Sequence, residues 1–177
     1  MKCVALLRGI NLGSTNKIKM ADLMRLFADL GHGDVRTYLQ SGNVVFSVGA
    51  DPEKLVKPIE KAILDELGLT VTVLLRTGPD LTNVLETNPY LDRQDDPTKL
   101  HVTFLAEAPN PGRASAVQVP VGESAEFTLT GLEVYLHCPD GYGRTKLNNA
   151  FFEKKLGVAA TTRNWRTVVA LHDMAGG

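Results

Sequence analysis

The segment Cys3–Lys19 reads CVALLRGINLGSTNKIK and joins a short apolar run to a loop of small polar residues. The five consecutive apolar residues Cys3–Leu7 are typical of a β-strand that is buried on both faces. Glycine, asparagine, serine and threonine dominate the segment 9–16, and Lys17 and Lys19 precede residues with helical spacing. Loops of this composition between a strand and a helix often bind an anion. The segment therefore predicts a first strand–loop–helix unit and a candidate anion site.

The pattern continues through the first half of the chain. The expected elements are a helix over residues 20–30, strands over 35–40 and 43–48, a helix from 51 to 68, and a strand over 71–75. Ser41-Gly42 predicts a two-residue hairpin, because glycine readily takes a positive φ. Pro58 should kink the second helix or restart it. The order strand, helix, strand, strand, helix, strand is the split βαβ pattern, with both helices on one face of a four-stranded sheet.

The second half is also expected to mix helices and strands. The predicted elements are a short helix from 79 to 85, strands over 100–105, 126–130 and 132–138, a helix over 147–156, and a C-terminal helix capped by Asn164. Residues 106–124 are rich in helix and strand breakers, which predicts a surface excursion with one helical turn near 113–117. The predicted class is therefore α+β: a ferredoxin-like (βαββαβ) subdomain at 1–77, packed on a smaller mixed α+β subdomain at 78–177 with a three-stranded patch.

Composition limits the possible functions. The 177 residues carry a formal net charge of −1, which argues against a protein that coats nucleic acid non-specifically. The apolar run after Lys2 stops at Arg8, too short for a signal peptide, and no stretch approaches a membrane span. Cys3 and Cys138 are far apart without a CxxC motif, and the four histidines lack metal-ligand spacing. We expect a cytoplasmic protein with no cofactor, no metal ion and no membrane partner.

Three segments pair cations with a predicted helix start, where free N–H groups and the helix dipole favour an anion. The candidate ligand-binding residues are Arg8, Asn11, Lys17 and Lys19 in the first segment, Arg144 and Lys146 in Gly143–Lys146, Arg163, Asn164 and Arg166 in the third, and Asn43 in the hairpin. For each segment alone, an ordinary turn with solvated charges is the commoner interpretation. If the three meet, they predict a pocket between the two subdomains for a small ligand bearing a phosphate or a carboxylate.

Two alternative functions use the same residues. The first is nucleic-acid binding through the basic side chains. A standard RNA-recognition mode needs aromatic residues on the central strands, whereas Phe46 is expected in the core and Tyr38 alone on the other face. The second is an enzyme acting on a phosphorylated substrate, with Ser41 or Asn43 as polar participants and no positioned base. The segment 141–146, GYGRTK, fits neither the dinucleotide nor the P-loop motif.

Several longer motifs together resemble a known family. They are Ala5–Asn11, Lys17–Met20, Thr37–Phe46, Gly143–Leu147, Phe152-Glu153 and Ala160–Val168. In these segments the chain resembles the bacterial domain-of-unknown-function family numbered 1697, from residue 3 to about 171, with no recognised part in 106–124. The resemblance implies a two-subdomain α+β protein and carries over no catalytic residue. Its motifs coincide with the three candidate segments.

Overall fold

The computed structural model describes residues 1–176, and the chain divides into two compact units. The first unit contains Met1–Asn83 and the residues from Ala170 onward, and the second contains Val84–Val169. Each unit is built on one four-stranded antiparallel sheet, and the described residues form six α-helices. The end of the chain thus belongs to the first unit, whereas the sequence placed it in the second. Within residues 1–176 no helix has the length and apolar character that crossing a bilayer requires.

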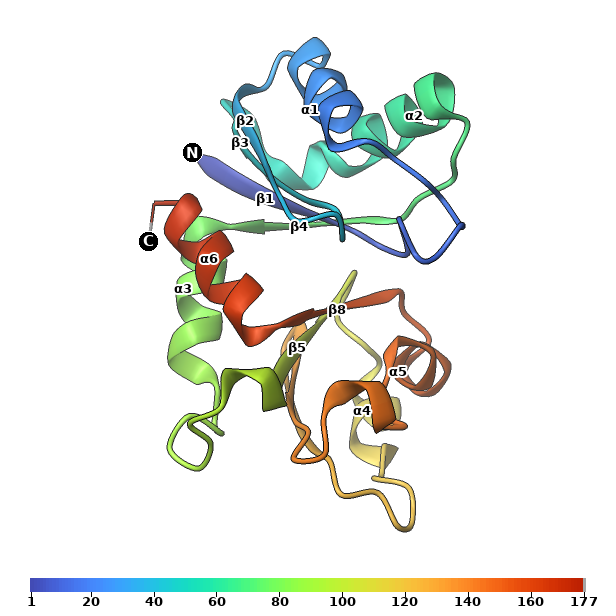
Figure 1. The fold of residues 1–177 in the computed structure, drawn as a ribbon, viewed down its shortest axis with the longest axis vertical. Coiled ribbons are helices and arrows are strands. Elements are labelled where there is room, and N and C mark those ends of the chain that lie inside the picture. The colour runs from blue at the N-terminus through green and yellow to red at the C-terminus, as the bar shows by residue number, and fades with distance from the viewer. Residues whose placement is uncertain (177) are drawn as a thin grey trace. The chain divides into compact units, whose positions relative to one another are not determined.

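The first unit alternates strands and helices in the expected order. Its elements are β1 (Lys2–Leu7), α1 (Met20–Asp29), β2 (Gly33–Tyr38), β3 (Asn43–Ser47), the 3-10 helix η1 (Pro52–Lys54), α2 (Val56–Leu67), β4 (Val73–Thr77) and the beginning of α3 (Gly78–Thr87), which extends past the unit boundary. The strands lie in the order β2-β3-β1-β4, and each neighbouring pair is antiparallel. Helices α1 and α2 lie on one face of this sheet (Figure 1). Asp51 caps η1, and α2 then starts afresh at Val56 with Pro58 in its first turn.

The core of the first unit lies between this sheet and its two helices. Alternate residues of β1 point into it, and they pack with residues of β3, α1 and α2; the cluster includes Cys3, Ala5, Leu7, Val44, Phe46, Leu23, Phe27, Ile59 and Ile63. The rings of Phe27 and Phe46 meet edge to face with their centroids 5.0 Å apart. Val4 and Leu6, on the other face of β1, are also fully buried. The apolar run at the N-terminus is therefore a strand buried on both faces, as predicted.

The β2–β3 connection is longer than the sequence suggested. It contains residues 39–42, because β2 ends at Tyr38 and β3 begins at Asn43. Leu39 has φ +59° and Gly42 has φ +88°. The buried amide of Asn43 closes the loop by donating to the Tyr38 carbonyl at 2.7 Å and to Ser41 Oγ at 2.9 Å. The predicted two-residue hairpin is wrong, because these side-chain hydrogen bonds stabilise a wider turn. The turn propensities of the residues do not include such bonds.

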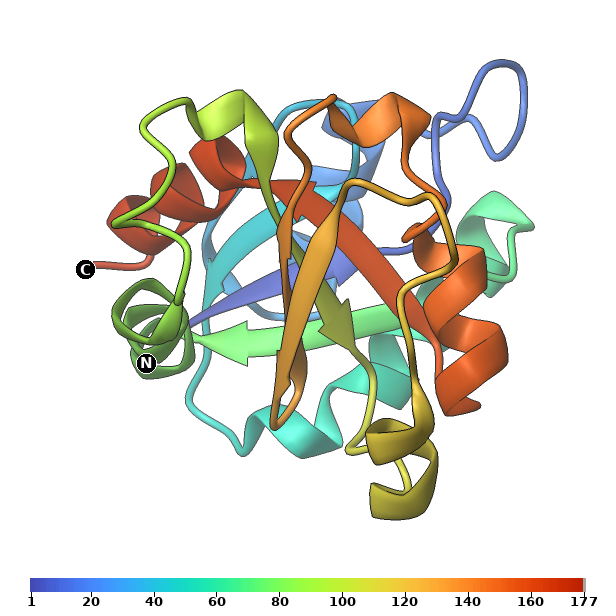
Figure 2. The same cartoon turned by 90° about the horizontal axis from the view of Figure 1, so that it is seen from below.

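The second unit contains one strand more than expected. Its elements are η2 (Pro97–Lys99), β5 (Leu100–Leu105), α4 (Pro111–Ala116), β6 (Glu126–Thr130), β7 (Glu133–His137), η3 (Tyr142–Arg144), α5 (Asn149–Leu156) and β8 (Ala160–Asn164), followed by α6 (Trp165–Met174), which extends past the unit boundary. The sheet order is β6-β7-β5-β8 (Figure 2). The predicted three-stranded patch is wrong because Ala160–Asn164 pairs antiparallel with β5. The helical turn predicted in the breaker-rich stretch is α4.

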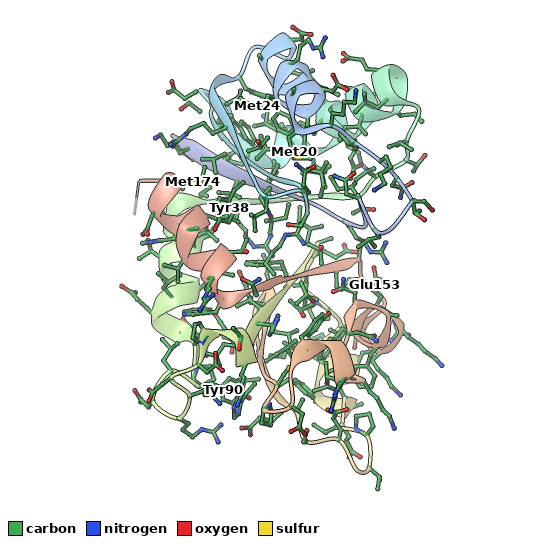
Figure 3. The ribbon with its side chains drawn as sticks, in the orientation of Figure 1. Met20, Met24, Tyr38, Tyr90, Glu153 and Met174 are labelled. Atoms are coloured by element: carbon green, nitrogen blue, oxygen red, sulfur yellow. The ribbon has the colours of Figure 1, made fainter. Side chains whose placement is uncertain are left out.

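Helix α5 and the segment before β5 cover different parts of this unit. Phe152 and Leu156 of α5 pack with Leu105, Val134, Leu136 and Ala160 of the sheet in one buried cluster. The polar segment before η2 is anchored on β6 by Tyr90, labelled in Figure 3, whose hydroxyl lies 2.8 Å from Thr128 Oγ1. Arg93 stacks over the Tyr90 ring and binds the Glu126 carboxylate at 2.8 Å. The acidic link is thereby fixed to the sheet.

Candidate functional site

The loop between β1 and α1 is held in a left-handed conformation at several positions. Gly9, Asn11, Gly13 and Asn16 all have positive φ, between +50° and +70°. Asparagine tolerates this region better than other residues with a Cβ atom, because its short amide bonds locally to the backbone. The Asn11 N–H donates to the Asn16 carbonyl at 3.0 Å, and the Asn16 amide donates to the Gly9 carbonyl at 3.1 Å. Asn11, which was predicted as a ligand-binding residue, and Asn16 thus define the shape of the loop.

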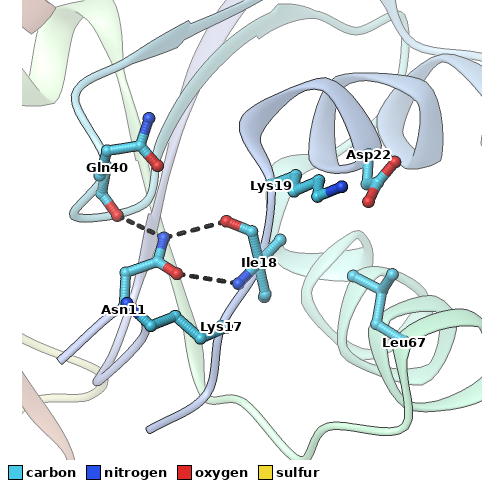
Figure 4. A pocket seen from close by; sticks show the side chains of 7 residues that line it. All are labelled: Asn11, Lys17, Ile18, Lys19, Asp22, Gln40 and Leu67. Atoms are coloured by element: carbon cyan, nitrogen blue, oxygen red, sulfur yellow. Dashed lines mark hydrogen bonds between the residues drawn. The ribbon is translucent and has the colours of Figure 1, made fainter. Parts of the chain in front are cut away.

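The Asn11 side chain joins this loop to the β2–β3 loop (Figure 4). Its Nδ2 donates to the Gln40 carbonyl at 2.7 Å and to the Ile18 carbonyl at 3.1 Å. Its Oδ1 accepts the Ile18 N–H at 2.8 Å. Both ends of the amide are therefore bonded to backbone groups of two segments. Asn11 therefore positions the two loops, and its direct contact with a ligand stays a prediction.

A pocket of about 530 Å³ opens beside these loops. Its lining comprises Asn11, Lys17, Ile18, Lys19, Asp22, Gln40 and Leu67 (Figure 4). Lys17 and Lys19 are exposed, and within residues 1–176 neither ammonium group has a hydrogen bond or an ion pair. Helix α1 begins directly after Lys19, and no side chain caps it. The pocket thus has two cations and one carboxylate, Asp22, next to a helix N-terminus without a side-chain cap, and this excess of positive charge favours an anion.

The second candidate segment already holds a carboxylate of the chain itself. The Lys146 N–H donates to Glu123 Oε2 at 3.0 Å, and the Thr145 hydroxyl donates to Glu123 Oε1 at 3.1 Å. Thr145 Oγ1 in turn accepts the Leu147 N–H at 3.1 Å, which leaves its proton for Glu123. The hydrogen bond from the Lys146 N–H is the main cause that lowers the pKa of Glu123 below its usual range. The backbone N–H of Lys146, which was expected to bind a ligand, therefore bonds to a carboxylate of the chain itself.

The expected position of this segment at the start of an α-helix is also wrong. Residues Tyr142–Arg144 form η3, and α5 begins only at Asn149. The cap of α5 is Asn148, whose Oδ1 accepts the Phe151 N–H at 3.0 Å. Arg144 and Lys146 line a second pocket of about 260 Å³ together with Glu123 and Asp140. The two cations there face two carboxylates, so this pocket favours an external anion less than the first one.

The third candidate segment divides between a strand and a helix. Arg163 lies in β8, is 6% exposed, and donates to Thr161 Oγ1 at 2.7 Å and to the Thr162 carbonyl at 3.0 Å. Burial lowers the pKa of Arg163 to about 10. Asn164 caps α6 as predicted, since its Oδ1 accepts the Thr167 N–H at 2.9 Å. Arg163 is therefore a buried strand residue and not a loop cation.

The structure brings only some of the predicted residues together. Asn11, Lys17 and Lys19 share the first pocket, and Arg144 and Lys146 share the second. The other five predicted residues, Arg8, Asn43, Arg163, Asn164 and Arg166, line neither of these two pockets. Asp22 and Gln40 line the first pocket and were not predicted. Their signal in the sequence is weak, because an acid in a first helical turn and a polar loop residue are both common without a ligand.

His137 is held by polar side chains, and Cys138 is buried in the core. His137 Nδ1 lies 3.1 Å from Glu126 Oε1 and its Nε2 lies 2.9 Å from the Gln94 amide. Cys138 is buried in the core of the second unit, and burial raises its pKa to about 11. His137 and Cys138, although adjacent, do not form a reactive pair. In the part of the chain that the structure describes, no group of three or more His, Cys, Asp or Glu residues is placed to hold a metal ion.

Comparisons with known proteins give a family and a related fold. The model of a family described as a protein of unknown function, DUF1697, matches residues 1–135. A solved structure of the conserved bacterial protein SP0830 from Streptococcus pneumoniae is similar, with a TM-score of 0.78 at 22% sequence identity and 98% of each chain covered. At this identity the similarity shows the fold alone. No curated protein matches the sequence.

Proposed function

The chain belongs to the DUF1697 family, whose description assigns no activity, and we propose that it binds a small ligand bearing a phosphate or carboxylate group beside Lys17 and Lys19. The observation that carries this proposal is the first pocket, where two ammonium groups without an intramolecular partner in residues 1–176 adjoin an uncapped helix. An anion at the first turn of a helix gains about 0.3–1 kcal/mol from the dipole, and more where it is partly buried. Two lysines add to this attraction.

Side-chain hydrogen bonds define the main chain of the loop that presents these cations. The Asn11 and Asn16 side chains make three hydrogen bonds to its backbone and a fourth to the Gln40 carbonyl of the β2–β3 loop, so Lys17 and Lys19 start from a fixed main chain. Ordering a loop on binding costs affinity, and a preformed loop avoids that cost. The same bonds tie Gln40 to the pocket. This organisation supports binding rather than a solvated surface loop.

Two further features of the protein follow by inference. The βαββαβ order of the first unit and its strand order β2-β3-β1-β4 support a ferredoxin-like fold. Cys3 and Cys138 are both free and buried, which supports a reducing, cytoplasmic location. Phe46, the aromatic residue of β3, packs with Phe27 in the core of the first unit. It does not offer a base-stacking surface, so the proposal favours a small ligand over single-stranded nucleic acid.

The test is a ligand titration followed by thermal unfolding. Phosphate, sulfate, a nucleotide and a sugar phosphate are added at millimolar concentration to the wild type and to the double variant Lys17→Ala/Lys19→Ala. Ligand at 100 times its Kd should stabilise the wild type by about 2.7 kcal/mol. The control is Lys154→Ala/Lys155→Ala, which removes the same charge from exposed positions at the end of α5.

Two results decide the outcome. The proposal is supported if the stabilisation disappears in the pocket variant and persists in the α5 variant. It fails if none of the four compounds raises the melting temperature of the wild type. Binding of oligonucleotides with an affinity that falls steeply with salt, in proportion to the phosphates contacted, would favour the nucleic-acid alternative.

A further inference from the structure

The size of the first pocket indicates more than a bare anion. Its volume of about 530 Å³ falls within the range of about 300–1,000 Å³ that is usual for small organic ligands. Inorganic phosphate or sulfate would contact the lysines and leave most of that space to water. Ile18 and Leu67 supply an apolar part of the lining. The pocket is therefore suited to an anionic group attached to a larger body.

A carboxylate also lines this pocket and gives it a second chemical character. Asp22 stands in the first turn of α1, and the side chain of Lys19 points toward it (Figure 4). Arg25 binds Asp22 Oδ1, and within residues 1–176 no hydrogen bond reaches the second oxygen, Oδ2. The Asp22 side chain is 37% exposed, so it is accessible to a solute. A carboxylate repels a bare anion but accepts strong hydrogen bonds from hydroxyl groups.

Gln40 adds a second polar group that suits hydroxyls. Its side-chain amide has no partner in the described chain, and its backbone carbonyl is held by Asn11 at 2.7 Å. An amide both donates and accepts, as a hydroxyl does. The lining therefore combines two cations with one carboxylate and one amide. A ligand that matches all of these groups carries an anion and several hydroxyls.

We propose that the ligand is a phosphorylated polyol, a sugar phosphate or the ribose phosphate of a mononucleotide. Its phosphate lies at Lys17 and Lys19, and its hydroxyls bond to Asp22 and Gln40. This inference rests on the proposed anion-binding function and adds the class of the ligand. The hydroxyl contacts to a charged acceptor predict that ribose 5-phosphate binds roughly 10- to 100-fold more tightly than inorganic phosphate.

The decisive measurement is calorimetric titration of three probes: inorganic phosphate, ribose 5-phosphate and adenosine 5′-monophosphate. Each is titrated into the wild type and into Asp22→Asn. Asp22→Asn removes the repulsion of bare phosphate and weakens the acceptor for hydroxyls. It should therefore bind inorganic phosphate more tightly and ribose 5-phosphate more weakly than the wild type, a crossover that a merely structural role of Asp22 does not produce. The control, Asp65→Asn, neutralises an exposed carboxylate of α2 that is paired with Lys61.

The possible outcomes separate the ligand class from the anion site. If inorganic phosphate and ribose 5-phosphate bind equally to the wild type, or if Asp22→Asn weakens both alike, the polyol class is refuted and anion binding stands. If none of the three probes binds, the proposed function itself fails, and this inference with it. Should Asp22→Asn not fold, Gln40→Ala replaces it, and that variant must weaken ribose 5-phosphate without changing the affinity for inorganic phosphate. Tighter binding of the nucleotide than of ribose 5-phosphate would identify the nucleotide as the member of the class.

Discussion

Replacing Asn11 by alanine should destabilise the first unit, because the Asn11 side chain joins two of its loops. The variant loses three hydrogen bonds, to the Ile18 carbonyl, the Ile18 N–H and the Gln40 carbonyl. It also places alanine at φ +53°, where a Cβ atom without a bonding side chain is strained. Asn11→Ala combines the loss of hydrogen bonds with backbone strain, and comparison with Asn11→Gly separates the two effects.

The size of the effect follows from these two terms. A net contribution of about 0.5–1.5 kcal/mol per bond gives roughly 1.5–4.5 kcal/mol for the three bonds, and their partial exposure places the value in the lower half of this range. The left-handed conformation adds about 1 kcal/mol for alanine but not for glycine. We therefore expect Asn11→Ala to lower the free energy of unfolding by about 3 kcal/mol, and Asn11→Gly by about 2 kcal/mol. For a chain of this size, 3 kcal/mol corresponds to a drop of about 6–12 °C in melting temperature.

Urea unfolding of the wild type, Asn11→Ala and Asn11→Gly measures both terms. Hydrogen exchange at the Ile18 amide, whose N–H is bonded to Asn11, reports the local effect and should quicken in both variants. An Asn11→Ala variant within 0.5 kcal/mol of the wild type would contradict the hydrogen-bond argument. A glycine variant less stable than the alanine variant would contradict the argument from φ.

Three further predictions concern other positions. Burial lowers the pKa of His101 to about 4, so the unfolded chain binds a proton at this residue more readily than the folded chain does. The folded protein should therefore lose stability as the pH falls from 6.5 toward 4, and His101→Phe should remove this pH dependence of the urea midpoint. Gly42→Ala places a Cβ atom 2.7 Å from Ile10 Cδ1 at φ +88°, and should lower the free energy of unfolding by about 2–4 kcal/mol. Gly68→Ala also has a positive φ but open space around its Cβ atom, and should lower it by about 1 kcal/mol; urea unfolding measures both. The Lys146 N–H lowers the pKa of Glu123, so the wild type should melt at a higher temperature than Glu123→Gln at any pH above the usual glutamate pKa. This difference in melting temperature should vanish as the pH falls through the lowered pKa, and a difference that is independent of pH would contradict the argument.

Elements whose stabilising pattern is local were predictable from the sequence. The strand β1 was evident because all of its central residues are apolar. Helix α1 was predicted from the helical spacing of Met20, Leu23, Met24, Phe27 and Leu30, of which Leu23 and Phe27 are buried. The strand β8 was missed because its residues, ATTRN, lead directly into a helix and have little apolar character. Its identity as a strand depends on pairing with β5, more than fifty residues earlier, as in the contact of Thr103 with Thr162 at a separation of 59 residues. No local pattern contains that pairing.

The candidate site shows the same division between local and distant information. Lys17 and Lys19 were identified because a loop with small polar residues and cations precedes a helix. Gln40 was not identified, because its position beside Asn11 depends on a contact across 29 residues of sequence. Asp22 was not identified, because an acid in a first helical turn is common without a ligand. Asn11 was predicted as a ligand contact, and the structure gives its amide a second role, which is to bond the backbone of two loops. The sequence indicated which residue mattered but not what the residue does.

The contrast between the first and second candidate segments explains why composition alone overpredicts anion sites. Both offer backbone donors and two cations in a glycine-containing loop. At Thr145 and Lys146 the carboxylate of Glu123, more than twenty residues away, accepts the donors. At Lys17 and Lys19 the nearby carboxylate, Asp22, is bonded to Arg25 instead. The same local pattern is therefore a closed structural contact in one place and an open pocket in the other. What decides between them is whether the fold brings an internal carboxylate to the donors, and that depends on tertiary structure.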